Sequence, residues 1–596
     1  MRIQAASALL AALLLTTACE DMNDPAAPVT RTPSSLVTTG DWVVNALDDV
    51  FDADGCTAGH CSLREAVRAA VDGEHITFGV TGTIQLSAPG MPLERSIVIA
   101  GPGAEHLTIA AAAIGTNYGH FVVRPEATVA ISGIRLTGGV GTAGGSINNF
   151  GALALEAVEI AGNSGGFGGG IASTGTLTIV RSMIRDNVAS RTGGGIYSEG
   201  TLTIDGSDMI ANHVQSALAS GGGGVRNNTG TLVVRDSRFE DNVVVGSPAQ
   251  GGALESSGES AHTLVLRTLF TGNEADGGGA IFNDRAAMEI RESTIDGNHA
   301  RRGRGGAIIS QEGSLDVANT LVRFNTATAP EFGAVAGSTI FGHDASVTLR
   351  HVGVFMNTLP DLDDGAWGAA VLNGGSNASL QLFNSIVAGN LNGPEQFDVA
   401  AIDAGADIRG NVLGVPFPLL TGLDADNSTN ISIVPGDWEA SFGLAAASPA
   451  GAIARYTVLP GSPVIDRGVD DGCMALDLAG TPRPQGAACD AGPIEFVPIA
   501  DLDGPVASAL SGALHPVAAG MSIDFSGLVH DAATGGSVIT GAEASLDGFT
   551  TTIALDAGDG AFDSPSEHVR GSFAAPADAG IHDLCLRGTD EAGNVG

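Results

Sequence analysis

Residues 177–187 read LTIVRSMIRDN, and close copies of this phrase return along the chain from about residue 150 to residue 390. Each copy has two aliphatic residues separated by one residue, then four residues, an apolar residue, two residues and an asparagine. An internal repeat of 24 to 33 residues is typical of a solenoid, in which each copy forms one turn. The asparagines that close the copies are Asn163, Asn187, Asn212, Asn242, Asn273, Asn298, Asn325, Asn357 and Asn390.

The positions eight and three residues before each asparagine are apolar in every copy. Such spacing predicts short strands, three to a turn, whose aliphatic side chains point inward. Stacked turns repeat at roughly 4.8 Å and place each aliphatic residue above its equivalent, so that one continuous core forms. We therefore predict an all-β fold built on a parallel β-helix. The first set is Leu155, Ile179, Ile204, Val234, Val265, Ile290, Val317, Leu349 and Leu382, and the second is Ile160, Ile184, Met209, Phe239, Phe270, Ile295, Val322, Val354 and Val387.

Asparagine and glycine occupy the predicted corners of each turn. Asparagine tolerates left-handed backbone angles, and stacked asparagines can hydrogen-bond from turn to turn as a ladder. Glycine supplies the other corner in phrases such as GGGIAS (168–173) and GGAIFN (278–283). These paired phrases resemble the repeats of chlamydial-type polymorphic outer membrane proteins and of bacterial β-helix proteins over roughly residues 76–400. The resemblance implies a right-handed helix.

The stretch CSLREAVRAA (61–70) is the exception, because it has the pattern of a helix. Ser62 and Glu65 form a capping box, an apolar face follows, and Gly73 is a stop signal. The open end of a β-helix exposes an edge and a core to other chains. We therefore predict that residues 41–75 form a helical cap over the first coil. The predicted apolar face consists of Leu63, Ala66, Val67 and Ala70.

Three segments carry further resemblances. Residues 48–70, DDVFDADGCTAGHCSLREAVRAA, resemble the CSLREA domain that begins exported bacterial β-helix proteins. Residues 459–496 resemble the choice-of-anchor Q domain, which implies a terminal coil and extends the predicted β-helix over residues 76–500. Here Pro493 replaces a usual small residue. Residues 501–596 resemble a bacterial immunoglobulin-like sandwich with alternating hairpins, and a last strand is expected beyond Gly596.

Residues 1–19 have the features of an export signal, with one early arginine, an apolar run and the ending LTTAC. This ending resembles a lipoprotein cleavage box, with Cys19 as the lipidated residue. Ordinary cleavage near Ala18 is the alternative. Residues 20–40 are rich in Pro, Thr, Ser and Ala and predict a flexible tether. Export permits disulfides, and closeness in sequence predicts Cys56–Cys61 and Cys473–Cys489, with Cys585 unpaired.

The charge of the chain restricts its partners. There are 27 Lys and Arg against 66 Asp and Glu, for a net charge of −39. Such a surface repels phosphate backbones, so we expect no nucleic-acid partner. It can attract divalent cations, and structural Ca²⁺ could bind at the acidic joints between domains. The candidate ligands are Asp48, Asp49, Asp52 and Asp54 at one joint, and Asp501 and Asp503 at another.

The best candidate ligand site is DLDDGAWG (361–368), which places Asp361, Asp363 and Asp364 before Trp367. Carboxylates beside an aromatic ring suit a sugar or a calcium-assisted site. The alternative is an exposed turn whose tryptophan fills a gap in the core. The basic phrase RRGRGG (301–306) either binds an anionic glycan or is a solvated corner. No catalytic residue is assigned, since no nucleophile elbow, metal-ligand histidine pair or phosphate loop is found.

These observations favour a non-catalytic, lipid-anchored and monomeric protein of the bacterial cell envelope or outside, which presents a long face to a cell-surface glycan or protein. The alternative is a polysaccharide lyase or glycoside hydrolase with its site near residues 340–370. Carboxylate pairs can cleave glycosidic bonds. The absence of lysine removes one usual base of β-helical lyases.

Overall fold

The computed structural model describes residues 41–596 except 112–118, 217–219, 247, 329–337, 359–367, 391–395, 403–404, 415–428, 433–441, 444–456, 459–461, 498–503, 513–518, 532–536, 547 and 578–583. No helix among the described residues is long and apolar enough to cross a membrane.

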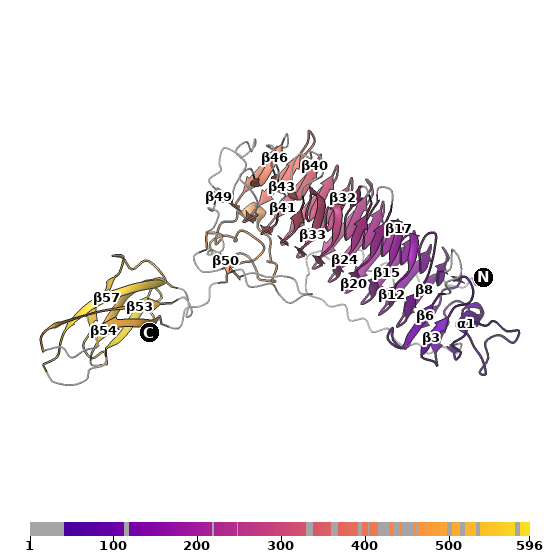
Figure 1. The fold of residues 1–596 in the computed structure, drawn as a ribbon, viewed down its shortest axis with the longest axis horizontal. Helices are drawn as coiled ribbons and strands as arrows, with labels where there is room; N and C mark the ends of the chain where they lie inside the picture. Colours follow the sequence, from indigo (N-terminus) through magenta and orange to yellow (C-terminus); the bar gives the residue numbers. More distant parts are fainter. Residues whose placement is uncertain are drawn as a thin grey trace, which may run out of the picture. The chain divides into compact units, whose positions relative to one another are not determined.

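Three parallel sheets wrap around one core, and most coils contribute one strand to each sheet (Figure 1). Sheet 1 contains β1 (Trp42–Val44), β2 (His75–Phe78), β5 (Val98–Ala100), β8 (Thr128–Ser132), β11 (Ala152–Glu156), β15 (Thr176–Val180), β19 (Thr201–Asp205), β24 (Thr231–Arg235), β29 (His262–Leu266), β33 (Ala287–Arg291), β37 (Ser314–Ala318), β41 (Ser346–Arg350), β44 (Ser379–Phe383) and β47 (Gly405–Arg409). Sheet 2 contains β3 (Gly82–Gln85), β6 (Leu107–Ala110), β9 (Arg135–Thr137), β12 (Glu159–Ala161), β16 (Met183–Arg185), β20 (Asp208–Ile210), β25 (Arg238–Glu240), β30 (Leu269–Thr271), β34 (Thr294–Asp296), β38 (Leu321–Arg323), β42 (Gly353–Phe355), β45 (Ile386–Ala388), β48 (Val412–Leu413) and β49 (Ile431–Ser432). Sheet 3 contains β4 (Met91–Leu93), β7 (Phe121–Val123), β10 (Ile147–Asn149), β14 (Ile171–Ser173), β18 (Ile196–Ser198), β23 (Val225–Asn228), β28 (Leu254–Ser257), β32 (Ile281–Asp284), β36 (Ile308–Gln311), β40 (Ser338–His343), β43 (Gly368–Gly374) and β46 (Gln396–Ile402).

The repeat positions form the core as predicted. Ile179 pairs in register with Ile204, and Ile204 pairs with Val234, so equivalent residues stack directly along sheet 1. All eighteen predicted inward positions are buried in a single hydrophobic cluster. The predicted parallel β-helix is therefore confirmed. Burying apolar surface this way stabilises the fold by roughly 25 cal/mol per Å².

A fourth set of strands was not predicted. After each ladder asparagine from Asn163 to Asn325 the chain adds a short strand before it enters sheet 3, and these strands pair with one another as sheet 4. Its members enclose a small separate core made of Ala189, Val214, Val244, Ala249 and Ala275. The strands are β13 (Ser164–Phe167), β17 (Val188–Thr192), β21 (His213–Gln215), β22 (Ser220–Gly221), β26 (Val243–Val245), β27 (Ala249–Gln250), β31 (Glu274–Gly277), β35 (His299–Arg304) and β39 (Thr326–Ala327).

The corner asparagines form a buried ladder along the stack. The side-chain Nδ2 of Asn163 donates to Oδ1 of Asn187 at 2.9 Å, and the backbone N–H of Asn163 donates to the same oxygen at 3.1 Å. The pattern repeats from coil to coil as far as Asn357, which donates to Asn390. The residue before the ladder position has a positive φ in several coils, for example 54° at Asp186.

The helix α1 (Leu63–Ala69) packs against β1 and β4. Its capping box is present, because Ser62 and Glu65 each accept the backbone N–H of the other. Leu63, Ala66 and Ala70 are buried in the same cluster as the solenoid core, and Val67 packs against that cluster. The apolar face predicted from the sequence is therefore the face that contacts the first strands.

The segment 462–497, which includes the 3₁₀ helix η3 (Asp470–Gly472), does not stack as a further coil. It packs on the outer side of sheet 2, where Val464, Leu478 and Ile494 meet Leu321 and Phe355. This differs from the terminal coil that the resemblance implied. The physical reason is that the last coils carry apolar residues on the outer face of sheet 2. Two further short strands, β50 (Phe442–Gly443) and β51 (Thr457–Val458), pair with each other.

Corner residues of the solenoid anchor this segment. Asn319 donates to the carbonyl of Leu476 at 2.6 Å, and Asn384 donates to that of Val469 at 3.0 Å. The buried imidazole of His351 lies between them in the stack, and its Nδ1 accepts a hydrogen bond from the buried Arg483. Burial, reinforced by the charge of Arg483, lowers the pKa of His351 to about 3.

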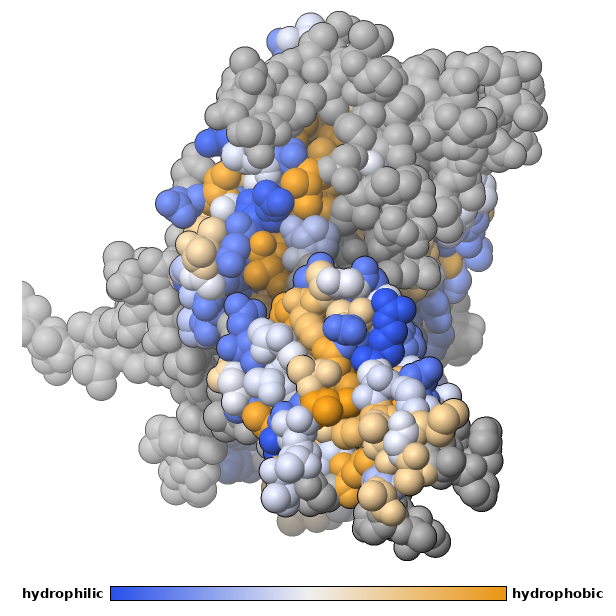
Figure 2. Space-filling view, turned by 90° about the vertical axis from the view of Figure 1, so that its left-hand side faces the viewer, coloured by the Kyte–Doolittle hydropathy of each residue, from blue (hydrophilic) through white to orange (hydrophobic). Residues whose placement is uncertain are grey.

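The C-terminal described residues form two antiparallel sheets around a separate core that includes Phe525, Val529 and Val569. Figure 2 shows apolar residues among the hydrophilic ones on the outside of this part, and Leu510 and Met521 are among its exposed apolar residues. One sheet contains β52 (Val506–Gly512), β53 (Ser522–His530), β57 (Ser566–Ala574) and β56 (Asp556–Ala557); the other contains β55 (Ile553–Ala554), β54 (Ile539–Ser545) and β58 (Cys585–Asp590).

Candidate functional site

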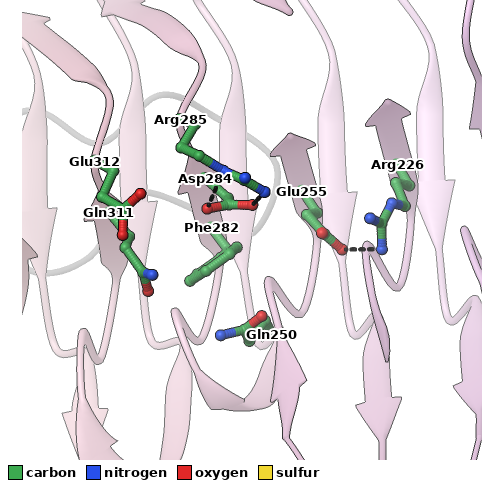
Figure 3. A pocket seen from close by; sticks show the side chains of 8 residues that line it. All are labelled: Arg226, Gln250, Glu255, Phe282, Asp284, Arg285, Gln311 and Glu312. Carbon is green, nitrogen blue, oxygen red and sulfur yellow. Dashed lines mark hydrogen bonds and ion pairs between the residues drawn. The ribbon is translucent and has the colours of Figure 1, made fainter. Parts of the chain in front are cut away.

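A polar cavity of about 400 Å³ lies on the outer face of sheet 3, beside β27 of sheet 4. Its size falls in the range of small-ligand sites. Four neighbouring coils contribute to it, through β23, β28, β32 and β36 (Figure 3). The residues that line it are Arg226, Gln250, Glu255, Phe282, Asp284, Arg285, Gln311 and Glu312.

The alternation of the strands decides which side chains reach this cavity. In β28, Leu254 and Ser256 are completely buried and face the core, so Glu255 between them faces outward. Parallel pairing places Arg226 beside Glu255, and Glu255 beside Phe282, on successive coils. The three side chains therefore form one outward row along sheet 3.

The charged pair in this row is Arg226 and Glu255. The guanidinium Nη1 of Arg226 lies 3.0 Å from Oε2 of Glu255, and it also donates to Thr192 of sheet 4. Glu255 is only 4% exposed although it belongs to the outer face, because Gly221 of β22 packs over its carboxylate. Burial raises the pKa of Glu255 to about 7, a shift that Arg226 opposes and Asp284 increases.

The other side of the cavity offers groups that can bind a ligand. Arg285 pairs with Asp284, with Nη2 2.9 Å from Oδ2. Within the described part of the chain, the side-chain amides of Gln250 and Gln311 have no hydrogen-bond partner. Each amide provides two donors and an acceptor. The cavity therefore combines free amides, carboxylates and guanidinium groups above an aromatic floor, Phe282.

Such a set suits a ligand rich in hydroxyl groups. Carboxylates and amides can accept and donate to adjacent hydroxyls, while an aromatic side chain packs against an apolar face. The lining contains two arginines and three acidic residues, so it has no strong preference for an anion. A carboxylic acid whose pKa is near 7 can also donate a proton at neutral pH.

None of the candidate site residues named from the sequence lines this cavity. Seven of them lie outside the described residues: Cys19, Asp361, Asp363, Asp364, Trp367, Asp501 and Asp503. The basic cluster is paired within the protein, since Arg301 lies 3.0 Å from Glu274 and Arg302 lies 3.3 Å from Asp276. These ion pairs engage both guanidinium groups within the protein.

The acidic residues of the first joint have contacts within the protein. Asp49 is buried and pairs with Arg64 at 2.8 Å. Asp52 lies 3.2 Å from His60, whereas Asp54 donates its backbone N–H to the carboxylate of Asp52 at 3.2 Å. The structure contains the disulfides Cys56–Cys61 and Cys473–Cys489. Among the described cysteines, Cys585 alone is free.

The sequence carries a signal for the cavity at positions outside the inward-facing repeat positions. The outward residue of sheet 3 follows the aliphatic residue of each glycine phrase, as Arg226 does in GGGVRN and Glu255 does in GGALES. Among the glycine phrases, only these two have a charged residue there, and they are consecutive. The equivalent residues in other copies are Ala172, Tyr197, Phe282, Ile309 and Leu372.

Comparison of the sequence with known protein families identifies one copy of the repeat. Residues 267–284 match the Chlamydia polymorphic membrane protein (Chlamydia_PMP) repeat. This segment contains Phe282 and Asp284 of the cavity. No curated protein sequence matches the chain.

Several solved structures are similar to parts of the chain at low identity. Pectate lyase Pel9A is 12% identical, with a TM-score of 0.31, and the match covers 77% of this chain and 97% of the lyase. XylC, solved in complex with xylose, is 11% identical with a TM-score of 0.43, covering 77% of this chain and 98% of XylC. The Azotobacter vinelandii mannuronan C-5 epimerase AlgE6 A-module is 13% identical with a TM-score of 0.24, covering 61% and 99%.

Proposed function

We propose that this protein is an exported, lipid-anchored β-helix protein of the bacterial cell surface that binds a glycan in the cavity on sheet 3. The observation that carries the proposal is the outward row Arg226, Glu255 and Phe282 beside the free amides of Gln250 and Gln311. The net charge of −39 disfavours polyanionic chains. The proposed ligand is therefore a neutral or amino-sugar-containing glycan.

The experiment is a glycan array on the exported chain, followed by calorimetry with the best ligand. Gln311→Ala removes a free amide and is expected to weaken binding about tenfold, which corresponds to one hydrogen bond of about 1.4 kcal/mol. The matched control is Gln381→Ala, because Gln381 is exposed on the outer face of sheet 1. Equal loss in both variants, or selective binding of uronate polymers, would contradict the proposal.

The placement at the cell surface draws on the export signal, the two disulfides and the polymorphic membrane protein repeat. Lipidation is tested by fractionation and by incorporation of labelled fatty acid. Cys19→Ala is expected to release the protein from membranes, whereas Cys585→Ser, the control at the free thiol, is expected to leave it there. A Cys19→Ala protein that stays with the membrane would remove the lipid anchor from the proposal.

We also infer the finer architecture that the resemblances imply. The packing of α1 on the first strands supports a CSLREA-type cap at the open end of a right-handed β-helix. The disulfide-linked segment 462–497 on sheet 2 is proposed to be choice-of-anchor Q-like, docked at the side of the solenoid. The two antiparallel sheets with their own core support an immunoglobulin-like module.

A second candidate function, cleavage of an extracellular polysaccharide, is favoured by Glu255. A carboxyl group with a pKa of about 7 in a cavity with a second carboxylate, Asp284, has the properties of a general acid. The test is incubation with uronate and neutral polysaccharides, with and without Ca²⁺. New reducing or unsaturated ends that disappear in Glu255→Gln would establish the enzyme, and their absence would leave binding as the function.

A further inference from the structure

A second cluster of titratable groups lies far along the sequence from the cavity, between the loop 48–60 and α1. The imidazole Nδ1 of His60 is 3.2 Å from Oδ2 of Asp52 and 3.3 Å from Oε2 of Glu65. Its other nitrogen, Nε2, is 3.1 Å from Oδ1 of Asp48. One ligand atom each from Asp52, His60 and Glu65 lie within 4.8 Å of one another. The proposed glycan site uses none of these residues.

The cluster is held rigidly before any ligand arrives. Glu65 is completely buried on its side-chain atoms, and its two oxygens accept the backbone N–H groups of Asp52 at 3.0 Å and Ser62 at 2.9 Å. The disulfide between Cys56 and Cys61 closes the loop that presents His60. Backbone donors that orient a carboxylate in this way are typical of the groups around a metal ligand.

The second feature of the cluster is the ring nitrogen Nδ1 of His60, which has carboxylate oxygens nearby but no hydrogen bond to them. Its Nδ1 atom is inaccessible to solvent and has no hydrogen-bond partner among the described residues, although two carboxylate oxygens face it. When Nε2–H donates to Asp48, Nδ1 is the unprotonated nitrogen of the ring and lies 3.2 Å from an oxygen of Asp52 and 3.3 Å from an oxygen of Glu65. Three electron-rich atoms then lie within 4.8 Å of one another, an arrangement that either a second proton on the ring or a cation would stabilise.

We propose that Asp52, His60 and Glu65 bind a divalent transition metal ion such as Zn²⁺, with Asp48 orienting the histidine from behind. In a tetrahedral site with bonds of 2.0–2.1 Å, ligand atoms are roughly 3.3 Å apart, close to the two distances from Nδ1. Imidazole is a poor ligand for Ca²⁺ and a good one for Zn²⁺. The site therefore differs from the calcium site expected from Asp52 and Asp54. The ion would tie the disulfide loop to α1.

A proton competes with the metal for the same nitrogen. The hydrogen bond with Asp48 raises the pKa of His60, and burial of the ring opposes this shift. Zn²⁺ affinity is consequently expected to rise with pH, since the ligand is the unprotonated Nδ1.

The test uses the full exported chain, stripped with a chelator and titrated with Zn²⁺ at neutral pH by calorimetry. One Zn²⁺ per chain is expected, with at least tenfold weaker binding in His60→Gln and in Asp52→Asn. Co²⁺ in place of Zn²⁺ is expected to give the visible absorption of a tetrahedral site. The matched control is His106→Gln, because the side chain of His106 is exposed and pairs with the neighbouring Glu105.

Two variants keep the test decisive if one of them fails to fold. Zn²⁺ binding that is equal in His106→Gln and in either folded site variant would overturn the proposal. An imidazolium at His60, seen by NMR at saturating Zn²⁺, would overturn it as well, because the cluster would then be an ion pair only. Binding of Ca²⁺ without binding of Zn²⁺ would also overturn the proposal.

Discussion

The side-chain oxygen Oδ1 of Asn242 accepts two hydrogen bonds from Asn212 on the preceding coil, one from the backbone N–H at 3.0 Å and one from Nδ2 at 3.1 Å. Asn242 in turn donates Nδ2 to the carbonyl of Met209 at 2.8 Å and to Asn273 at 2.9 Å. Because Asn242 is completely buried, no water can replace these bonds. Each ladder residue thus satisfies polar groups of both neighbouring coils.

Asn242→Ala is expected to lower the free energy of unfolding by about 3 kcal/mol. The substitution leaves the donors of Asn212 and one acceptor of Met209 buried without partners, and each such group costs about 1–3 kcal/mol, partly relieved by rearrangement. Chemical denaturation followed by circular dichroism measures the change. The control is Asp241→Asn, since Asp241 is exposed and its φ of 52° suits asparagine. A loss in Asn242→Ala no larger than in the control would contradict a stabilising ladder.

His351 makes the docking of segment 462–497 sensitive to acid. Its pKa is about 3 in the folded protein, below the ordinary value of 6.5, so the unfolded chain binds more protons between these two values. The stability that the neutral ring contributes is complete above about pH 6.5 and is lost as the pH falls toward 3. At pH 4.5, which is two units below 6.5, the loss is on the order of 3 kcal/mol.

The measurement compares unfolding at pH 7.5 and pH 4.5 for the native protein and His351→Asn. Asparagine tolerates the φ of 50° at this corner and does not titrate. The buried His120, whose pKa burial lowers to about 4, remains in both proteins, so the difference isolates His351. Identical pH dependence in the two proteins would show that His351 plays no part.

The two disulfides are expected to contribute unequally to the free energy of unfolding. Cys473–Cys489 spans 16 residues and Cys56–Cys61 spans 5. Loop-closure entropy predicts losses of about 3 and about 2 kcal/mol when each pair is replaced by serine. Limited proteolysis should detect opening of segment 462–497 only in the first double variant. Faster cleavage there in the second variant would mean that this segment is not held independently.

The core of the solenoid was predictable because its aliphatic residues must recur at the same position in every coil. Ile179, Ile204 and Val234 must occupy equivalent points on successive coils, and the sequence records that requirement at every repeat. The helix α1 was equally readable, since Ser62 and Glu65 define its start locally. The stacking positions can be recognised within a single repeat, and the helix cap can be recognised within a single short segment.

The cavity and the docked segment could not be predicted in this way. The contact between Arg226 and Glu255 depends on the register between coils of unequal length, and the burial of Glu255 depends on Gly221 of sheet 4. Likewise, Arg483 meets His351 across 132 positions of sequence. Outward residues follow no period, so their neighbours are known only when the coils are placed in register.

Glu255→Gln is expected to stabilise the protein at alkaline pH. The pKa of Glu255 is raised to about 7 in the folded state, so folding favours the protonated form, and stability falls as the pH rises from about 4.5 through 7. Glutamine keeps the shape but cannot ionise. The difference in unfolding free energy between variant and native protein should therefore grow by on the order of 2 kcal/mol between pH 5 and pH 8.

The exposed control Glu199→Gln, in the coil of β18, should show no such growth. A constant difference for Glu255→Gln would mean that Arg226 keeps the carboxylate ionised throughout, and would remove the case for Glu255 as a general acid.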